Sequence, residues 1–114
     1  MKNKILSIVI PIYNSSKFLK KTILSCIKKD LILSYEIICV NDNSNDKILH
    51  IIKKIQKKYN NIKIINNKKN LGVGIARNIG IKASTGKYIL FLDSDDEIIK
   101  KRIKKILNFL AKID

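Results

Sequence analysis

The chain has 114 residues, 46% hydrophobic and 29% charged, so its length fits one domain with an ordinary core and its composition excludes a disordered chain. Its formal net charge of +15 attracts anions such as phosphates. Arginine, the usual side chain for reading bases, is scarce beside lysine, and aromatic residues make up only 6% of the chain, so we expect no nucleic-acid partner. An A/T-rich genome, whose codons favour lysine, isoleucine and asparagine, is an alternative source of the charge.

The cysteines and the start of the chain bear on its location. Cys26 and Cys39 lie in apolar segments without metal-ligand spacing, which favours small buried side chains in a reducing compartment over a disulfide. The apolar segment 5–12 resembles a signal peptide only superficially, because Ser7 and Pro11 interrupt it and no small-residue cleavage site follows. No segment approaches the ~18 apolar residues of a membrane span. We therefore expect a cytoplasmic protein, with the inner face of a membrane as an alternative location.

Strands and helices are predicted to alternate along the chain. The first strand is a nearly continuous β-branched run, typical of a strand buried on both faces of a parallel sheet. The predicted strands are 5–12, 35–40, 62–65 and 87–92. The predicted helices are 16–29, about 48–59, 74–83 and about 98–113.

Four such alternations without a hairpin signal predict one α/β domain over residues 1–114. We expect a Rossmann-like, mostly parallel sheet with helices on both faces. In sheets of this kind, ligands bind at the carboxyl ends of the strands, near the point where the strand order reverses. Candidate site residues are therefore those that directly follow a strand.

An acidic cluster, Asp93-Ser94-Asp95-Asp96, directly follows the fourth predicted strand. Because Asp93 and Asp95 are two positions apart in an extended segment, one or both could hold a divalent cation. A cation held by few protein oxygens keeps coordination positions that a nucleoside diphosphate can fill. Alternatively, the acidic residues cap the following helix.

Other polar residues follow the first three strands. Tyr13 comes after the first strand, where its ring could lie along a base or cover the sheet edge. Asp42 follows the second strand and could accept a hydrogen bond from a base or ribose, or close an Asx-turn or a helix N-terminus. Arg77 follows the third strand among small residues, where its guanidinium could neutralise phosphate or form an ordinary surface ion pair.

Other nucleotide-binding and phosphoryl-transfer designs are excluded by position. Gly72-Val73-Gly74 begins a dinucleotide-type Gly-x-Gly, but it follows the third strand, and Arg77 stands where the third glycine belongs. A phospho-receiver domain would need acidic residues directly after the first strand, and no Walker A sequence is present. His50 has no triad partner, so we predict a structural role for it.

Four motifs in this order resemble the amino-terminal part of family 2 glycosyltransferases of the GT-A fold. They occupy residues 7–14, 40–46, 70–78 and 86–96. The resemblance implies a nucleotide-sugar donor, most often a UDP-sugar, and a divalent metal, Mn²⁺ or Mg²⁺, for a role in polysaccharide biosynthesis. The residues implied to contact the nucleobase region are Pro11, Tyr13, Asp42 and Arg77. By the same resemblance, Asp93 would contact the ribose and Asp95 would bind the metal.

The sequence departs from the family's pattern in two kinds of place. Asn41 replaces a frequent aspartate and Asn43 a frequent glycine, although asparagine tolerates the left-handed conformation that a glycine would serve there. Family members continue well beyond the acidic motif with a part that supplies the acceptor pocket, for a saccharide or lipid-linked acceptor, and the base of an inverting transfer. This sequence ends one predicted helix after the motif. We therefore expect no general base in it, and nucleotide binding with little or no transfer.

Two other functions remain as alternatives. A nucleotidyltransferase also uses strand-end carboxylates, but it usually has a glycine-rich basic loop after the first strand, which this sequence lacks. A non-catalytic module would bind nucleotides or an anionic surface through its basic helices. The last predicted helix places basic residues opposite an apolar stripe, which suits a membrane surface, and a solvated helix face explains the same pattern.

Overall fold

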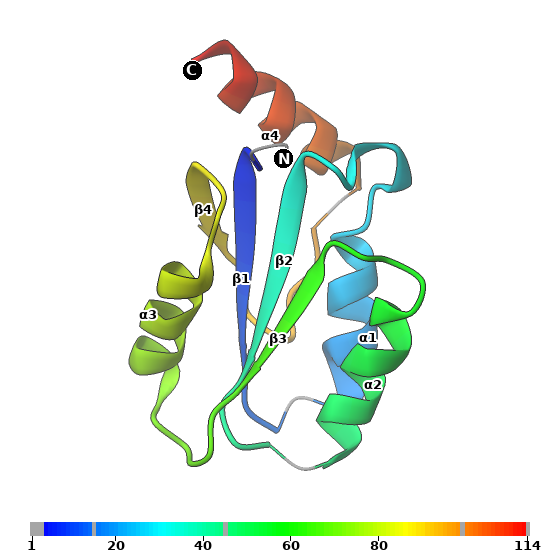
Figure 1. The fold of residues 1–114 in the computed structure, drawn as a ribbon. Helices are drawn as coiled ribbons and strands as arrows, with labels where there is room; N and C mark the ends of the chain where they lie inside the picture. Colours follow the sequence, from blue (N-terminus) through cyan, green and yellow to red (C-terminus); the bar gives the residue numbers. More distant parts are fainter. Residues whose placement is uncertain (1–3, 15, 45, 99, 114) are drawn as a thin grey trace.

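The computed structural model describes residues 4–14, 16–44, 46–98 and 100–113 (Figure 1). Its strands are β1 (Leu6–Ile12), β2 (Tyr35–Asn41), β3 (Ile62–Asn66) and β4 (Tyr88–Phe91). Its helices are α1 (Ser16–Ser25), α2 (Asp46–Gln56), α3 (Val73–Ala83) and α4 (Lys100–Lys112), with a 3-10 turn η1 (Lys29–Leu31). The strands form one parallel sheet in the order β3-β2-β1-β4. The chain therefore builds the sheet outward from β1 to β3 and then returns to place β4 on the other side of β1.

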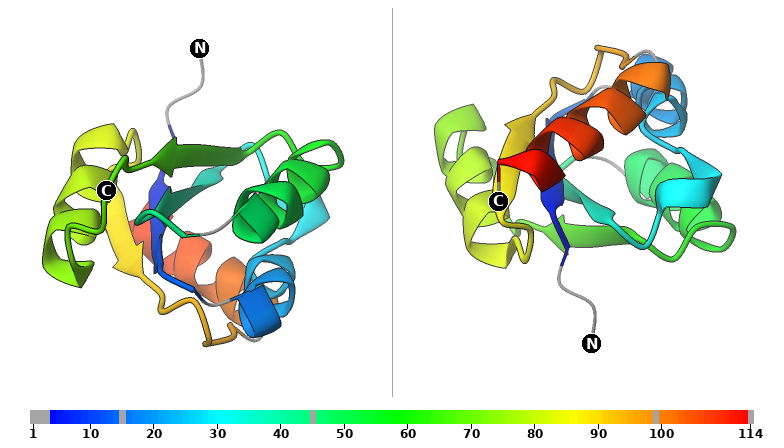
Figure 2. Two further views of the ribbon diagram at one scale, coloured as in Figure 1. Left: turned by 90° about the horizontal axis from the view of Figure 1, so that it is seen from below. Right: turned by 90° about the horizontal axis from the view of Figure 1, so that it is seen from above.

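Helices cover both faces of this sheet, α3 on one face and α1 and α2 on the other (Figure 2). The two-residue period of β1 explains the arrangement, because successive side chains point to opposite faces. Ile8, Ile10 and Ile12 belong to the core on the α1 and α2 side, which also includes part of α4. Val9 packs with Ala76 of α3 on the opposite face. The predicted α/β fold is confirmed, and every strand pair in the described sheet is parallel.

Helix α1 is shorter than the predicted helix 16–29. Its regular part ends at Ser25, and after one tighter turn the backbone bonds to the Tyr35 side chain instead of continuing the helix. The Tyr35 hydroxyl donates to the Cys26 carbonyl at 2.6 Å and accepts from the Lys28 amide at 2.8 Å. The sequence pattern shows apolar spacing but not this tertiary contact, which gives the chain an alternative to helical hydrogen bonds.

A buried carboxylate joins the amino-terminal parts of several strands. Glu36 of β2 is 2% exposed, and its Oε2 accepts hydrogen bonds from the Ser7 hydroxyl and the Thr85 amide, both at 2.6 Å. Its Oε1 lies 2.8 Å from Nζ of Lys63 on β3. Gly86 donates its amide to the Ser7 hydroxyl, and a Cβ there would lie 2.5 Å from the Ser7 backbone nitrogen. This network therefore ties the connection before β4 to β1, β2 and β3.

The remaining sequence expectations concern the cysteines and the last helix. Cys26 and Cys39 are buried and unpaired, as predicted, and burial raises the pKa of Cys26 to about 12. The inward stripe of α4 is also confirmed, since Ile103 and Leu107 are buried in the core. Among the basic residues on the opposite side of this predicted helix, the side chains of Lys100 and Lys101 lie outside the described residues. None of the described helices is both long enough and apolar enough to cross a membrane.

Candidate functional site

An open pocket of about 440 Å³ lies at the carboxyl ends of β1, β2 and β4. This is the edge where the strand order reverses, because β2 and β4 flank β1 on opposite sides. Five of the six predicted site residues line it: Pro11, Tyr13, Asp42, Asp93 and Asp95. The sixth, Arg77, contacts Asp93 from α3.

Asp42 directly follows β2, is buried, and fixes the connection between β3 and α3. Its Oδ1 accepts hydrogen bonds from the Asn67 side-chain amide at 2.8 Å and the Leu71 amide at 2.9 Å. Its Oδ2 accepts one from the Gly72 amide at 2.9 Å. Burial alone would raise the pKa of Asp42, but these hydrogen bonds hold it below its ordinary value. Asp42 therefore shapes one wall of the pocket.

The turn after β2 is closed by other residues than Asp42. Asn41, not Asp42, accepts the Ser44 amide at 3.0 Å in an Asx-type contact. Asn43 has φ 60°, so the expectation that it tolerates the left-handed conformation is confirmed. Asn14, after β1, has φ 53°, and its amide donates to the Ser44 hydroxyl at 3.0 Å. The turns after β1 and β2 therefore stabilise each other.

We expect Asp42→Asn to lower the free energy of unfolding by about 1–2 kcal/mol, because one of the amides of Leu71 and Gly72 would lose its acceptor. Urea unfolding at pH 7 measures the effect. Asp30→Asn is the matched control, because Asp30 is exposed and makes an ion pair with Lys28 at 3.2 Å. We expect it to change stability much less than Asp42→Asn does, because solvent screens an exposed ion pair. Equal losses in the two variants would contradict the role of Asp42.

Arg77 reaches from α3 across the end of β4. Its Nη2 lies 3.4 Å from Oδ1 of Asp93, and its guanidinium carbon lies 5.6 Å from the centre of the Phe91 ring. Its Nε is buried without a hydrogen-bond partner among the described residues. The ion pair is half exposed, so its stabilisation is at most about 1 kcal/mol. An anionic ligand could therefore replace Asp93 as the partner of Arg77 at little cost.

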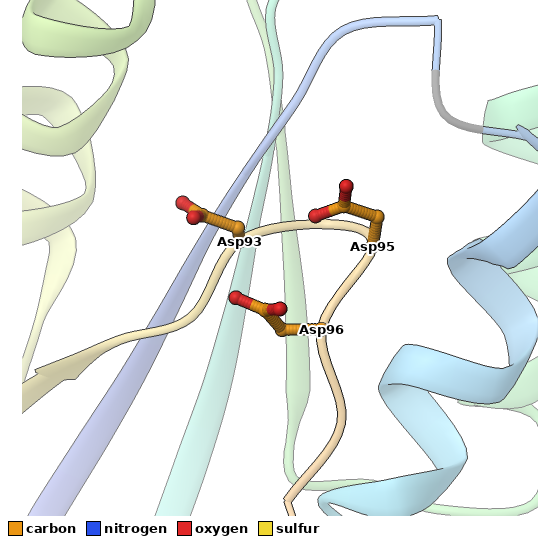
Figure 3. A group of neighbouring side chains, drawn as sticks. All are labelled: Asp93, Asp95 and Asp96. Carbon is orange, nitrogen blue, oxygen red and sulfur yellow. The ribbon is translucent and has the colours of Figure 1, made fainter.

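The acidic cluster forms a tight group on the loop after β4. The carboxylates of Asp93, Asp95 and Asp96 are exposed and offer oxygens within 4.8 Å of one another (Figure 3). Helix α4 begins only at Lys100, so Asp93 and Asp95 do not sit at its N-terminus as the capping alternative required. Carboxylate oxygens are the ligands that Mg²⁺ and Mn²⁺ prefer. The donor set therefore fits a hard divalent cation, and Asp96 joins the two predicted residues.

The contacts that hold this loop in place could not be predicted from the sequence. The Thr22 hydroxyl of α1 donates to the Ser94 carbonyl at 2.9 Å, and the Ile98 amide donates to the Ser25 hydroxyl at 3.0 Å. Within the loop, the Asp96 amide donates to the Asp93 carbonyl at 3.0 Å. Thr22 and Ser25 lie more than seventy positions away in the sequence, on a helix face that also contains apolar residues. Only the packing of α1 against the loop identifies them.

Comparison with known proteins gives the same picture of the chain. Its residues 7–114 match the family model described as "Glycosyl transferase family 2". An uncharacterized glycosyltransferase of Haemophilus influenzae is 39% identical over 110 residues, which cover 96% of this chain and 44% of that protein. The poly(ribitol-phosphate) beta-glucosyltransferase of Bacillus spizizenii is 42% identical over 106 residues, which cover 91% of this chain and 17% of that enzyme.

Solved structures agree with the sequence matches. The crystal structure of S. aureus TarS 1-349 has a TM-score of 0.85 at 31% sequence identity, and the match covers 95% of this chain and 32% of that one. A structure of the same protein in complex with UDP-GlcNAc has the same TM-score and identity. This chain thus spans less than half the length of these relatives. A match over nearly its whole length nevertheless fixes the assignment: the chain belongs to glycosyl transferase family 2.

Proposed function

We propose that this chain is the donor-binding part of a metal-dependent, inverting glycosyltransferase that uses a UDP-sugar. The observation that carries the proposal is that Asp42, Asp93 and Asp95 line one strand-end pocket, while Arg77 contacts Asp93 and Asp96 completes the acidic cluster. TarS, whose fold is similar, has been crystallised with UDP-GlcNAc and with UDP, which supports UDP as the nucleotide. Family membership favours this function over a nucleotidyltransferase.

Each of the predicted site residues has a proposed role. Pro11, Tyr13 and Asp42 would hold the nucleobase region, where Asp42 also keeps the adjoining backbone in place. Arg77 would exchange its long contact with Asp93 for the nucleotide. Asp93 would then be available to the ribose.

Asp95 is proposed as the main metal ligand, with Asp93 and Asp96 close enough to help hold the ion. A bound Mn²⁺ or Mg²⁺ would neutralise negative charge on the diphosphate leaving group. The exposed position of all three carboxylates leaves room for the nucleotide to approach. The Thr22 and Ser25 contacts would keep the loop in place before the donor binds.

The acceptor side is proposed to lie in the additional length that the relatives have. Asp96 belongs to the acidic cluster, and Glu97 lies 3.8 Å from Lys21, so neither is proposed as the general base. We therefore propose that this chain alone binds the donor with little or no transfer. Two relatives are named as poly(ribitol-phosphate) glycosyltransferases. An anionic polymer is therefore a further candidate acceptor, besides a saccharide or a lipid-linked acceptor.

The test is thermal unfolding of the chain with UDP and Mn²⁺. We expect the two together to raise Tm more than either one alone, with a stabilisation of about 2.7 kcal/mol when the ligand is at 100 times its Kd. ADP and GDP with Mn²⁺ serve as controls, and we expect a smaller shift with each. No shift at millimolar UDP and Mn²⁺ would count against the proposed function.

A further inference from the structure

A second pocket lies between α1 and α2, and none of its residues lines the candidate donor site. The two helices run side by side on one face of the sheet (Figure 1). The pocket has a volume of about 420 Å³. Its apolar lining consists of Leu24, Ile51 and Ile55, which are buried or half-buried and which we call its floor. Lys20, Lys54 and Lys58 stand around that floor, and we call this feature the α1–α2 groove.

The charge of the α1–α2 groove is entirely positive. No acidic residue lines it among the described residues, and Lys20, Lys54 and Lys58 make no ion pair with a described residue. Other lysines, such as Lys63, do pair with a carboxylate in this structure. An anionic ligand would therefore meet lysines whose charge no described carboxylate neutralises.

The groove is elongated. An adjoining hollow of about 420 Å³ shares Lys58 and Tyr59 with it and adds Lys29 and Ile32 beside η1. Lys58 follows Lys54 by four residues, and its amide still bonds to the Ile55 carbonyl, so the two positions are about 6 Å apart along the helix direction. A row of cations at such spacing fits a chain with repeated negative charges better than it fits one isolated anion.

A structural explanation for lysines at this end of α2 also exists, because the carboxyl end of a helix attracts positive charge. That explanation applies equally to Lys53 and Lys57, which are exposed and line neither hollow. It accounts for basic residues at the helix end but not for their grouping around an apolar floor. Lys53 and Lys57 therefore provide a charge-matched control on the same segment.

We propose that the α1–α2 groove binds a linear phosphodiester polymer. The phosphates would lie against Lys20, Lys54 and Lys58, and the carbon backbone between them would cover Leu24, Ile51 and Ile55. This proposal depends on the proposed function in one respect, namely that the polymer is the acceptor of the transfer. The groove would hold that polymer outside the proposed donor site.

The groove fits a polyol or sugar phosphate chain better than the other large anions. Single-stranded nucleic acid uses successive aromatic side chains as stacking platforms, and the described groove offers only two rings, those of His50 and Tyr59. A membrane surface takes apolar side chains that protrude, whereas Leu24, Ile51 and Ile55 line a hollow and are buried or half-buried.

The probe is a fluorescent octamer of ribitol phosphate, titrated with the whole chain by anisotropy across a salt series. The slope of log affinity against log salt is negative, and we expect Lys54→Gln with Lys58→Gln to make it less steep by about 1.4, or 0.7 for each lost contact. That change corresponds to a loss of roughly 25-fold in affinity at 0.1 M salt. Lys53→Gln with Lys57→Gln removes the same charge. Its loss of affinity should be several-fold smaller than that of Lys54→Gln with Lys58→Gln.

Equal losses in the two double variants would overturn the proposal, because net charge and not the groove would then govern binding. A single-stranded oligonucleotide with eight phosphates and vesicles with anionic lipid are measured in parallel. If the oligonucleotide or the vesicles bound more tightly than the ribitol phosphate octamer, and Lys54→Gln with Lys58→Gln weakened that binding, the proposed polymer would not be the ligand of the groove. The UDP and Mn²⁺ shift in Tm should persist in the groove variants, so failure of the donor proposal would appear separately.

Discussion

Replacing Asp95 by asparagine is expected to abolish the part of UDP stabilisation that depends on Mn²⁺, while the protein stays folded. Asp95 is exposed in the acidic cluster and lines the strand-end pocket, so its carboxylate supports no buried contact. Asp95 is proposed to bind the cation through its negative charge, and the neutral amide oxygen of asparagine binds a divalent cation much more weakly. With metal and UDP at 100 times their joint Kd, about 2.7 kcal/mol of stabilisation should fall to the value for UDP alone. Thermal unfolding with UDP, with and without Mn²⁺ and a chelator, measures the loss.

Glu97→Gln is the matched control for this variant. Glu97 is also exposed, lies two positions further along the same loop, and makes only a long ion pair with Lys21 at 3.8 Å. The substitution removes one negative charge from the same region, but Glu97 lies outside the acidic cluster. The Mn²⁺-dependent shift should therefore survive in Glu97→Gln. If Asp95→Asn kept the full shift as well, Asp95 could not be the main metal ligand.

The elements of the fold could be predicted because their signals are local. The first strand is a β-branched run with both faces apolar, and the structure buries all of Leu6–Ile12. Helical spacing likewise located α2 and α4 close to their observed limits. The end of α1 could not be predicted in the same way, because it depends on the Tyr35 hydroxyl of another element.

The gathering of the site residues could also be predicted, because parallel strands present their carboxyl ends at one edge. Tyr13, Asp42 and Asp93 follow β1, β2 and β4, and all three line one pocket. The contacts that each side chain makes were harder to predict. A carboxylate after a strand has several common uses, and the three long-range hydrogen bonds of Asp42 depend on where the β3 to α3 connection passes. Sequence spacing does not carry that information.

Glu36 is the clearest case of a residue whose importance depends on tertiary placement, and Glu36→Gln is expected to destabilise the fold by about 3 kcal/mol at pH 7. Glutamine keeps one oxygen for the Ser7 hydroxyl and the Thr85 amide, but it turns an amide toward the ammonium group of Lys63. The variant loses the ion pair and leaves a cation facing donor hydrogens. Urea unfolding at pH 7 measures the difference, and Glu97→Gln is the exposed control.

The same carboxylate predicts how stability depends on pH. Burial alone would raise the pKa of Glu36, but Lys63, Ser7 and Thr85 lower it from 4.5 to about 2. A carboxyl whose pKa is lower in the folded state stabilises the fold above its unfolded pKa, so this contribution is complete above about pH 4.5 and is lost as the pH falls toward 2. It amounts to about 3 kcal/mol. The gap in unfolding free energy between the parent and Glu36→Gln should therefore narrow from pH 5 to pH 2, and a gap that stayed constant would show that the charge of Glu36 does not stabilise this network.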